Sequence, residues 1–114
     1  MYKLKFHKTL TPEKWSRFSS SQQILMIANE LNRAKNAFLR EDDEETKECY
    51  ERAFELLDLT ISVSHNRNKR KELIRFREVL GFDYLKKQKD VSRITALTKA
   101  IIFLDKDAYN LLNP

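Results

Sequence analysis

The sequence predicts an all-α protein, and three observations support this prediction. Only one glycine and two prolines occur in 114 residues, whereas β-rich folds use these residues in their many turns. Apolar residues recur every three to four positions over long stretches, which is the spacing of one buried helix face. Capping residues (Ser, Thr or Asp) precede several of these stretches. We therefore expect a small up-and-down bundle of four main antiparallel helices with a short N-terminal helix, because short links place consecutive helices side by side.

The chain length fits a single domain spanning 1–114. Residues 1–10 alternate weakly between apolar and polar types, but a lone strand has no pairing partner, so we expect an extended arm. Thr11 followed by Pro12 predicts the start of a short helix, with the hydroxyl as its cap. Trp15 on this helix is expected to seal one end of the bundle.

The first long helix is expected over about residues 21–40, and the pair Ser20 and Gln23 has the spacing of a capping box before it. Its buried face is predicted to carry Ile24, Ile27, Leu31, Ala34 and Phe38. The next helix begins after Asp42 or Asp43, and its pattern fades at residues 62–66. Its predicted buried residues are Tyr50, Ala53, Phe54, Leu57 and Ile61.

A fourth helix is predicted from about Asn68 to Leu80. Gly81 could end it in a left-handed turn, or the helix could continue through the apolar residues that follow. Asp90 is expected to cap a fifth helix, and 107–112 could form a last turn or two. The predicted buried stripe of the fifth helix is Ile94, Leu97, Ile101 and Leu104. Four long helices with short links complete the predicted bundle.

Charge is sorted along the chain in three blocks. Residues 1–40 carry eight Lys or Arg against two Asp or Glu, and residues 61–114 carry twelve against six. Residues 41–60 instead carry nine acidic residues against two basic ones. This sorting indicates that particular helix faces carry charges of one sign.

An acidic stripe is predicted on the third helix, where carboxylates follow one another at spacings of four, three, four and three residues. Its members are Glu44, Glu48, Glu51, Glu55 and Asp58. At 3.6 residues per turn they line one edge of the helix. Two interpretations stay open: a solvated helix edge, or a surface for a basic partner.

A basic stripe is predicted on the fourth helix and the residues before it. Its members are Arg67, Arg70, Lys71, Ile74, Arg75 and Arg77. Ile74 is an apolar residue among cations, which is a feature of interaction surfaces. A solvated helix, an acidic protein partner and nucleic acid are the three interpretations; the cations suit phosphates, but no aromatic platform or groove-reading module accompanies them.

No residue pattern predicts catalysis, a cofactor or a metal ion. The chain has no glycine-rich phosphate loop, and neither His7 nor His65 stands in the Glu-x-x-His spacing of helical metal sites. Cys49 is alone, which fits a reducing compartment, and the first residues lack the apolar stretch of a signal peptide. No stretch approaches the length of a membrane span.

We therefore expect a cytoplasmic, non-enzymatic protein that acts by protein–protein interaction through its charge-segregated helix faces. The partner is unknown and could be a second copy, because one copy's acidic stripe could meet the other's basic stripe in an isologous dimer. The alternative is an RNA-associated protein that uses the basic helix face around 67–77.

Overall fold

The computed structural model describes residues 4–112, with side chains through residue 110. This part of the chain folds into helices joined by short links and contains no strand. The helices are α1 (Pro12–Trp15), α2 (Ser20–Leu39), α3 (Asp43–Val63), α4 (Arg67–Leu85), α5 (Val91–Phe103) and α6 (Lys106–Leu112). The all-α prediction is confirmed.

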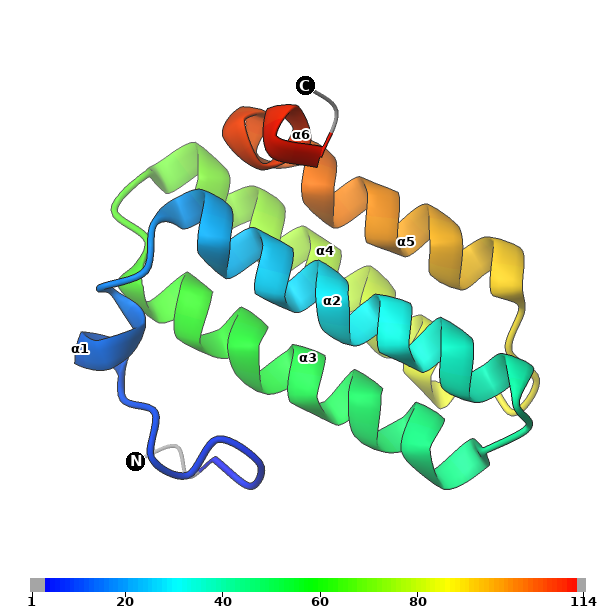
Figure 1. Cartoon of the computed structure of the whole chain (residues 1–114). Helices are drawn as coiled ribbons and strands as arrows, with labels where there is room; N and C mark the ends of the chain where they lie inside the picture. The colour runs from blue at the N-terminus through cyan, green and yellow to red at the C-terminus, as the bar shows by residue number, and fades with distance from the viewer. Residues whose placement is uncertain (1–3, 113–114) are drawn as a thin grey trace.

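The four long helices form an up-and-down bundle (Figure 1). Helix α2 packs most extensively, with α3 on one side and α5 on the other, and α4 contacts α3 and α5. Short α1 lies against α3, and α6 packs on α2 and α5 at the end where α5 finishes. The two helix pairs that are not neighbours in the ring, α2 with α4 and α3 with α5, lie diagonally across the core.

Three predicted helix starts are confirmed by their capping hydrogen bonds. The side chains of Thr11, Asp42 and Asp90 accept from backbone N–H groups of α1, α3 and α5. The predicted capping box of α2 is displaced by one residue. Ser19 is the N-cap, its Oγ accepts from the Gln22 amide, and the Gln22 side chain accepts from the Ser19 amide.

The turn between α2 and α3 contains the one residue with a positive φ outside glycine, Glu41 at 60°, within the described part of the chain. Its amide donates to the Phe38 carbonyl, and the Asp42 amide donates to the Ala37 carbonyl. These two bonds satisfy the last carbonyls of α2 in the pattern of a Schellman motif. Glycine usually occupies this left-handed position, because a side chain there is strained.

The core is built from one face of each long helix and from Trp15, which is fully buried as predicted for a residue that seals the bundle. The Trp15 indole N–H donates to Thr60 Oγ1 at 3.0 Å, so the ring's polar atom is satisfied. Helix α4 contributes least to the core among the three longest helices: four of its 19 residues are buried, against nine of 21 in α3. Much of α4 therefore faces outward.

A polar cluster fixes α6 and the α5–α6 link to the start of α2 and to α4. Asp105 is almost fully buried and accepts from the hydroxyls of Ser20 and Ser21, both at 3.0 Å, and from the Ala108 amide. The Lys69 ammonium donates to the same carboxylate at 2.6 Å and also contacts the Ser20 hydroxyl. Burial alone would raise the Asp105 pKa, but these donors together lower it to about 2.

A second buried polar pair joins α3 to the end of α4. The Tyr50 hydroxyl donates to Asp83 Oδ2 at 2.5 Å, and both side chains are fully buried. Burial, followed by the bond to Asp83, raises the pKa of Tyr50 far above its usual value. The other carboxylate oxygen of Asp83 has no hydrogen bond, although the Arg93 guanidinium lies 3.8 Å away. Tyr50 is therefore the hydrogen-bond donor on which Asp83 depends.

Candidate interaction surface on the outer face of helix α4

The predicted acidic stripe is not one continuous open edge in the folded protein. Glu44 is exposed and Glu48 is partly exposed, beside the Arg52 guanidinium at 3.9 Å. Glu51 accepts from the Tyr84 hydroxyl at 2.7 Å. The stripe is therefore open to solvent at Glu44 and in part at Glu48, whereas the other three members contact other elements of the chain.

Glu55 departs most from its predicted place, because its side chain is buried under the N-terminal arm. Its carboxylate accepts from the backbone amides of Lys5, Phe6 and His7 at 2.7–3.1 Å, and from His7 Nδ1 at 2.9 Å. Burial would raise the Glu55 pKa, but these hydrogen bonds lower it below its usual value. Glu55 therefore anchors the arm and cannot meet a partner while the arm is in place.

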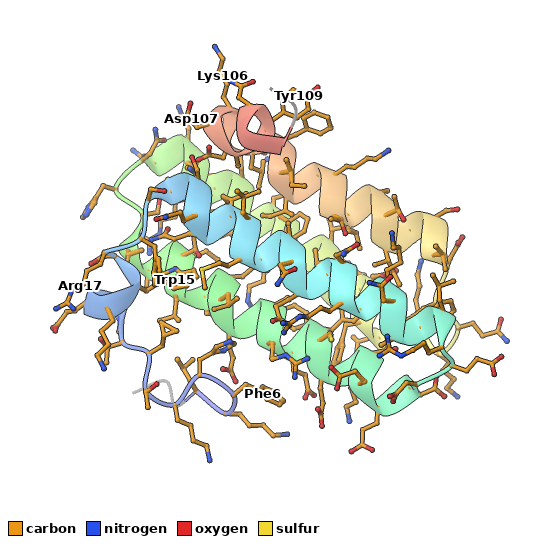
Figure 2. The ribbon with its side chains drawn as sticks, in the orientation of Figure 1. Phe6, Trp15, Arg17, Lys106, Asp107 and Tyr109 are labelled. Atoms are coloured by element: carbon orange, nitrogen blue, oxygen red, sulfur yellow. The ribbon has the colours of Figure 1, made fainter. Side chains whose placement is uncertain are left out.

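Residues 4–10 of the predicted arm are not extended, and residues 1–3 lie outside the described part of the chain. The Leu10 amide closes a turn onto the His7 carbonyl at 2.9 Å, and the segment bends back along α3. Figure 2 shows Phe6 in this loop, where the Arg52 guanidinium lies 5.6 Å from its ring. Residues 5–7 therefore pack against α3 through Glu55 and Arg52.

The cationic side chains of the predicted basic stripe are all exposed. Arg75 has one acidic neighbour, Glu72 at 3.8 Å, in an exposed pair of little energetic weight. Arg77 differs, because its guanidinium makes two hydrogen bonds to Asp58, at 2.6 and 3.2 Å, and lies over the Phe54 ring. This contact joins one member of the basic stripe to one member of the acidic stripe within the chain.

The exposed apolar residues at the end of α4 were not predicted from the sequence. Helix α4 does not stop at Gly81 but continues to Leu85, so Phe82 and Leu85 are carried on the helix with side chains 72% and 77% exposed. Ile74, 41% exposed, lies on the same side of α4, because at about 100° per residue positions 74, 82 and 85 fall within about 80° of one another around the helix. This spacing was available in the sequence once the helix was extended past Gly81.

These residues together form what we call the outer face of α4. Its members are Arg67, Arg70, Lys71, Ile74, Arg75, Glu78, Gly81, Phe82 and Leu85. Cations gather toward the start of the helix, and large apolar side chains gather toward its end. The start of this face can therefore make ionic contacts, and its end can make apolar contacts.

A groove of about 430 Å³ lies at the apolar end of this face, and we call it the Gly81 groove. Its lining residues are Phe54, Arg77, Glu78, Gly81, Phe82, Tyr84 and Leu85. The Phe54 and Tyr84 rings meet edge to face with centroids 5.5 Å apart, and Glu51 fixes the Tyr84 hydroxyl. The aromatic wall formed by Phe54 of α3 and Tyr84 of α4 is thus held in place before any partner arrives, which reduces the entropy lost on binding.

Gly81 is one of the residues that line this groove. A Cβ atom added there would meet no atom within 4 Å, and the backbone φ is not positive. Neither close packing nor a left-handed conformation therefore requires glycine, although glycine within a helix is less favourable than alanine by about 1 kcal/mol. Nothing within the folded chain explains this residue.

A second cavity, of about 410 Å³, lies where α2 and α4 begin, and its lining includes Ser20, His65 and Lys69. A serine beside a lysine can act as a nucleophile when the lysine is a neutral base. Here Lys69 donates to Asp105 as one half of an ion pair. Because the pKa of Asp105 is low, this carboxylate is a weak base and does not take the proton from the lysine. The cluster is better explained as the polar connection between helices described above.

Among residues 4–112, no group of three or more His, Cys, Asp or Glu side chains is arranged to hold a metal ion. In the same part of the chain, no helix combines the length and apolar character needed to cross a membrane. Comparisons with protein-family models, with curated proteins and with solved structures found no match for this chain. The surface itself is therefore the basis for a functional proposal.

Proposed function

We propose that this protein is a non-enzymatic interaction protein that binds another protein on the outer face of α4. The observation that carries the proposal is the Gly81 groove, flanked by the exposed Phe82 and Leu85, on the same helix face as a row of cations. Exposed apolar groups of this size beside polar residues are typical of protein interaction sites.

The apolar end and the cationic end of the outer face of α4 each indicate a chemical property of the partner. Burial of Phe82 and Leu85 would supply affinity, since apolar area removed from water is the main favourable term in association. The cations Arg70, Lys71 and Arg75 would select a partner with carboxylates and increase its association rate. We therefore expect a partner surface with an apolar side chain that enters the groove and acidic residues along one side.

Several observations favour binding over catalysis in this proposal. The lining of the Gly81 groove is apolar and aromatic apart from Arg77 and Glu78, without a paired nucleophile and base. The thiol of Cys49 is buried, and burial raises its pKa to about 11, which makes it a poor nucleophile. A free cysteine also supports the proposed cytoplasmic location.

Photo-cross-linking tests the proposal in the cells that make the protein. A benzophenone analogue of phenylalanine replaces Phe82 in one variant and Phe103 in a control variant, where the native side chain is 64% exposed on α5. We expect a protease-sensitive adduct at position 82, none at position 103, and loss of the adduct when Lys71→Glu is added. Equal adducts at both positions, or none at 82, would refute the proposal.

The same experiment distinguishes the RNA alternative. Exposed cations beside the exposed Phe82 ring could also bind phosphates and stack on a base. A nuclease-sensitive adduct at position 82 would support that interpretation and contradict the protein partner. Affinity for RNA would fall steeply with added salt, because counterions are released when phosphates are neutralised.

A further inference from the structure

We propose that the occupant of the Gly81 groove is a second copy of this chain, in an antiparallel pair of α4 helices related by a two-fold axis near Phe82. This inference rests on the proposed function and names its partner. It starts from Gly81, for which the fold itself provides no reason. A glycine on an exposed helix face allows another backbone or side chain to approach closely.

The apolar half of the outer face is complementary to itself. Phe82 projects as an exposed ring, 72% accessible, beside the groove that Gly81 leaves open. A two-fold axis brings the same surface patch of both copies together. Each copy would then place its Phe82 against the Gly81 groove of the other, and the exposed Leu85 side chains would close the edge of the contact.

The charges around Phe82 have the same self-complementary pattern. Glu78 lies four residues before Phe82, and Lys86 lies four residues after it, directly following the helix; both are exposed. When two α4 helices cross antiparallel at Phe82, Glu78 of each copy comes beside Lys86 of the other. A parallel arrangement would instead place like charges together.

The antiparallel arrangement also keeps the basic N-terminal ends of the two α4 helices apart. Arg70 and Arg75 lie twelve and seven residues before Phe82, or about 10–18 Å along the axis at 1.5 Å per residue. The two basic ends lie on opposite sides of the crossing, so their separation exceeds the screening length of about 8 Å. In one copy, the end of α4 and the start of α3, with Glu44 and Glu48, lie at the same end of the bundle (Figure 1). The basic end of each α4 would therefore extend toward the start of α3 in the other copy.

Sedimentation velocity over a concentration series, at low and high salt, tests the inference. We expect a monomer–dimer equilibrium that Phe82→Ser shifts toward monomer by at least tenfold in Kd. The matched control Phe103→Ser removes an equally large exposed ring from α5 and should leave the dimer unchanged. Gly81→Leu should fill the groove, keep the helix and abolish the dimer.

Charge reversal gives the decisive outcome. Glu78→Lys and Lys86→Glu should each weaken the dimer about tenfold, and the double variant should restore it, because the two charges are exchanged across the axis. Glu13→Lys on α1, with the same change in net charge as Glu78→Lys, is the control for that reversal. Independent effects of the two reversals, without restoration, would overturn the antiparallel pairing.

The outcome also separates this inference from the proposed function. A protein that remains monomeric at every concentration refutes the second copy; if the adduct at position 82 then contains a different protein, the proposed function stands. A dimer that is insensitive to Phe82→Ser, together with no specific adduct at position 82, refutes both.

Discussion

Replacement of Glu55 tests how the N-terminal arm is held. In the native protein its carboxylate accepts hydrogen bonds from three backbone amides and one imidazole nitrogen of residues 5–7. A hydrogen bond to a charged group contributes about 1.5–3 kcal/mol. Glu55→Gln keeps one acceptor oxygen but turns an NH₂ group toward N–H donors, so at least two of these bonds are lost. We expect the free energy of unfolding to fall by about 3 kcal/mol, less if the arm detaches and its amides bind water.

Urea denaturation and amide hydrogen exchange measure this effect. The amides of Lys5, Phe6 and His7 should be protected in the native protein and exchange freely in Glu55→Gln. Glu51→Gln is the matched control on the same helix, since Glu51 accepts one hydrogen bond, from the Tyr84 hydroxyl, and contacts the arm through a 4.0 Å ion pair with the exposed Lys5 side chain. Its cost should be about 1 kcal/mol with the arm still protected. Unchanged protection in Glu55→Gln would show that the carboxylate does not hold the arm.

The stabilisation by Glu55 should also depend on pH in a defined direction. Its pKa in the folded protein lies below its usual value, so the unfolded chain binds the proton more readily. The contribution is fully present above the unfolded pKa of about 4.3. It is lost as pH falls through the folded pKa. The stability difference between the native protein and Glu55→Gln should therefore shrink in acid, and a constant difference would contradict this reasoning.

Four further substitutions have defined effects on the free energy of unfolding, measurable by urea denaturation. Asp105→Asn should cost about 2–3 kcal/mol at neutral pH. Because the Asp105 pKa is lowered to about 2, that cost should decline as pH falls from about 4 to about 2. Tyr50→Phe should cost about 2 kcal/mol, because the buried Asp83 loses its hydrogen-bond donor; no loss would mean that the pair is dispensable. Gly81→Ala should add about 1 kcal/mol, and a destabilised variant would show that α4 needs glycine within the monomer. Glu41→Gly should add about 1 kcal/mol by removing a side chain from a positive φ.

The helix starts were predictable because their signals are local. A capping side chain bonds an amide two or three residues away, as Thr11, Asp42 and Asp90 do, so residue type and spacing suffice. Even the displaced capping box of α2 was an error of one residue between neighbouring serines. The hairpin of α2 and α3 followed from its apolar spacing for the same reason.

The charge stripes were predictable as positions on helices but not as surfaces. Helical spacing correctly places the acidic residues along α3, yet it cannot show that an arm nearly fifty residues earlier in the chain covers Glu55. Arg77 and Asp58 are likewise nineteen residues apart on different helices. Whether a charged side chain is accessible to a partner depends on contacts of this kind. The spacing of residues within one helix does not predict contacts with other segments of the chain.

The sequence by itself determined the helices, the order in which they pack and the sorting of charge onto α3 and α4. These features arise from hydrogen bonds and apolar contacts within a few residues or one helix turn. Only the tertiary structure decided that Glu55 holds the arm, and that α4 continues past Gly81 to expose Phe82 and Leu85 beside a groove. The physical reason is that exposure results from the packing of segments distant in sequence, so the free surface is known only after every other element has taken its place.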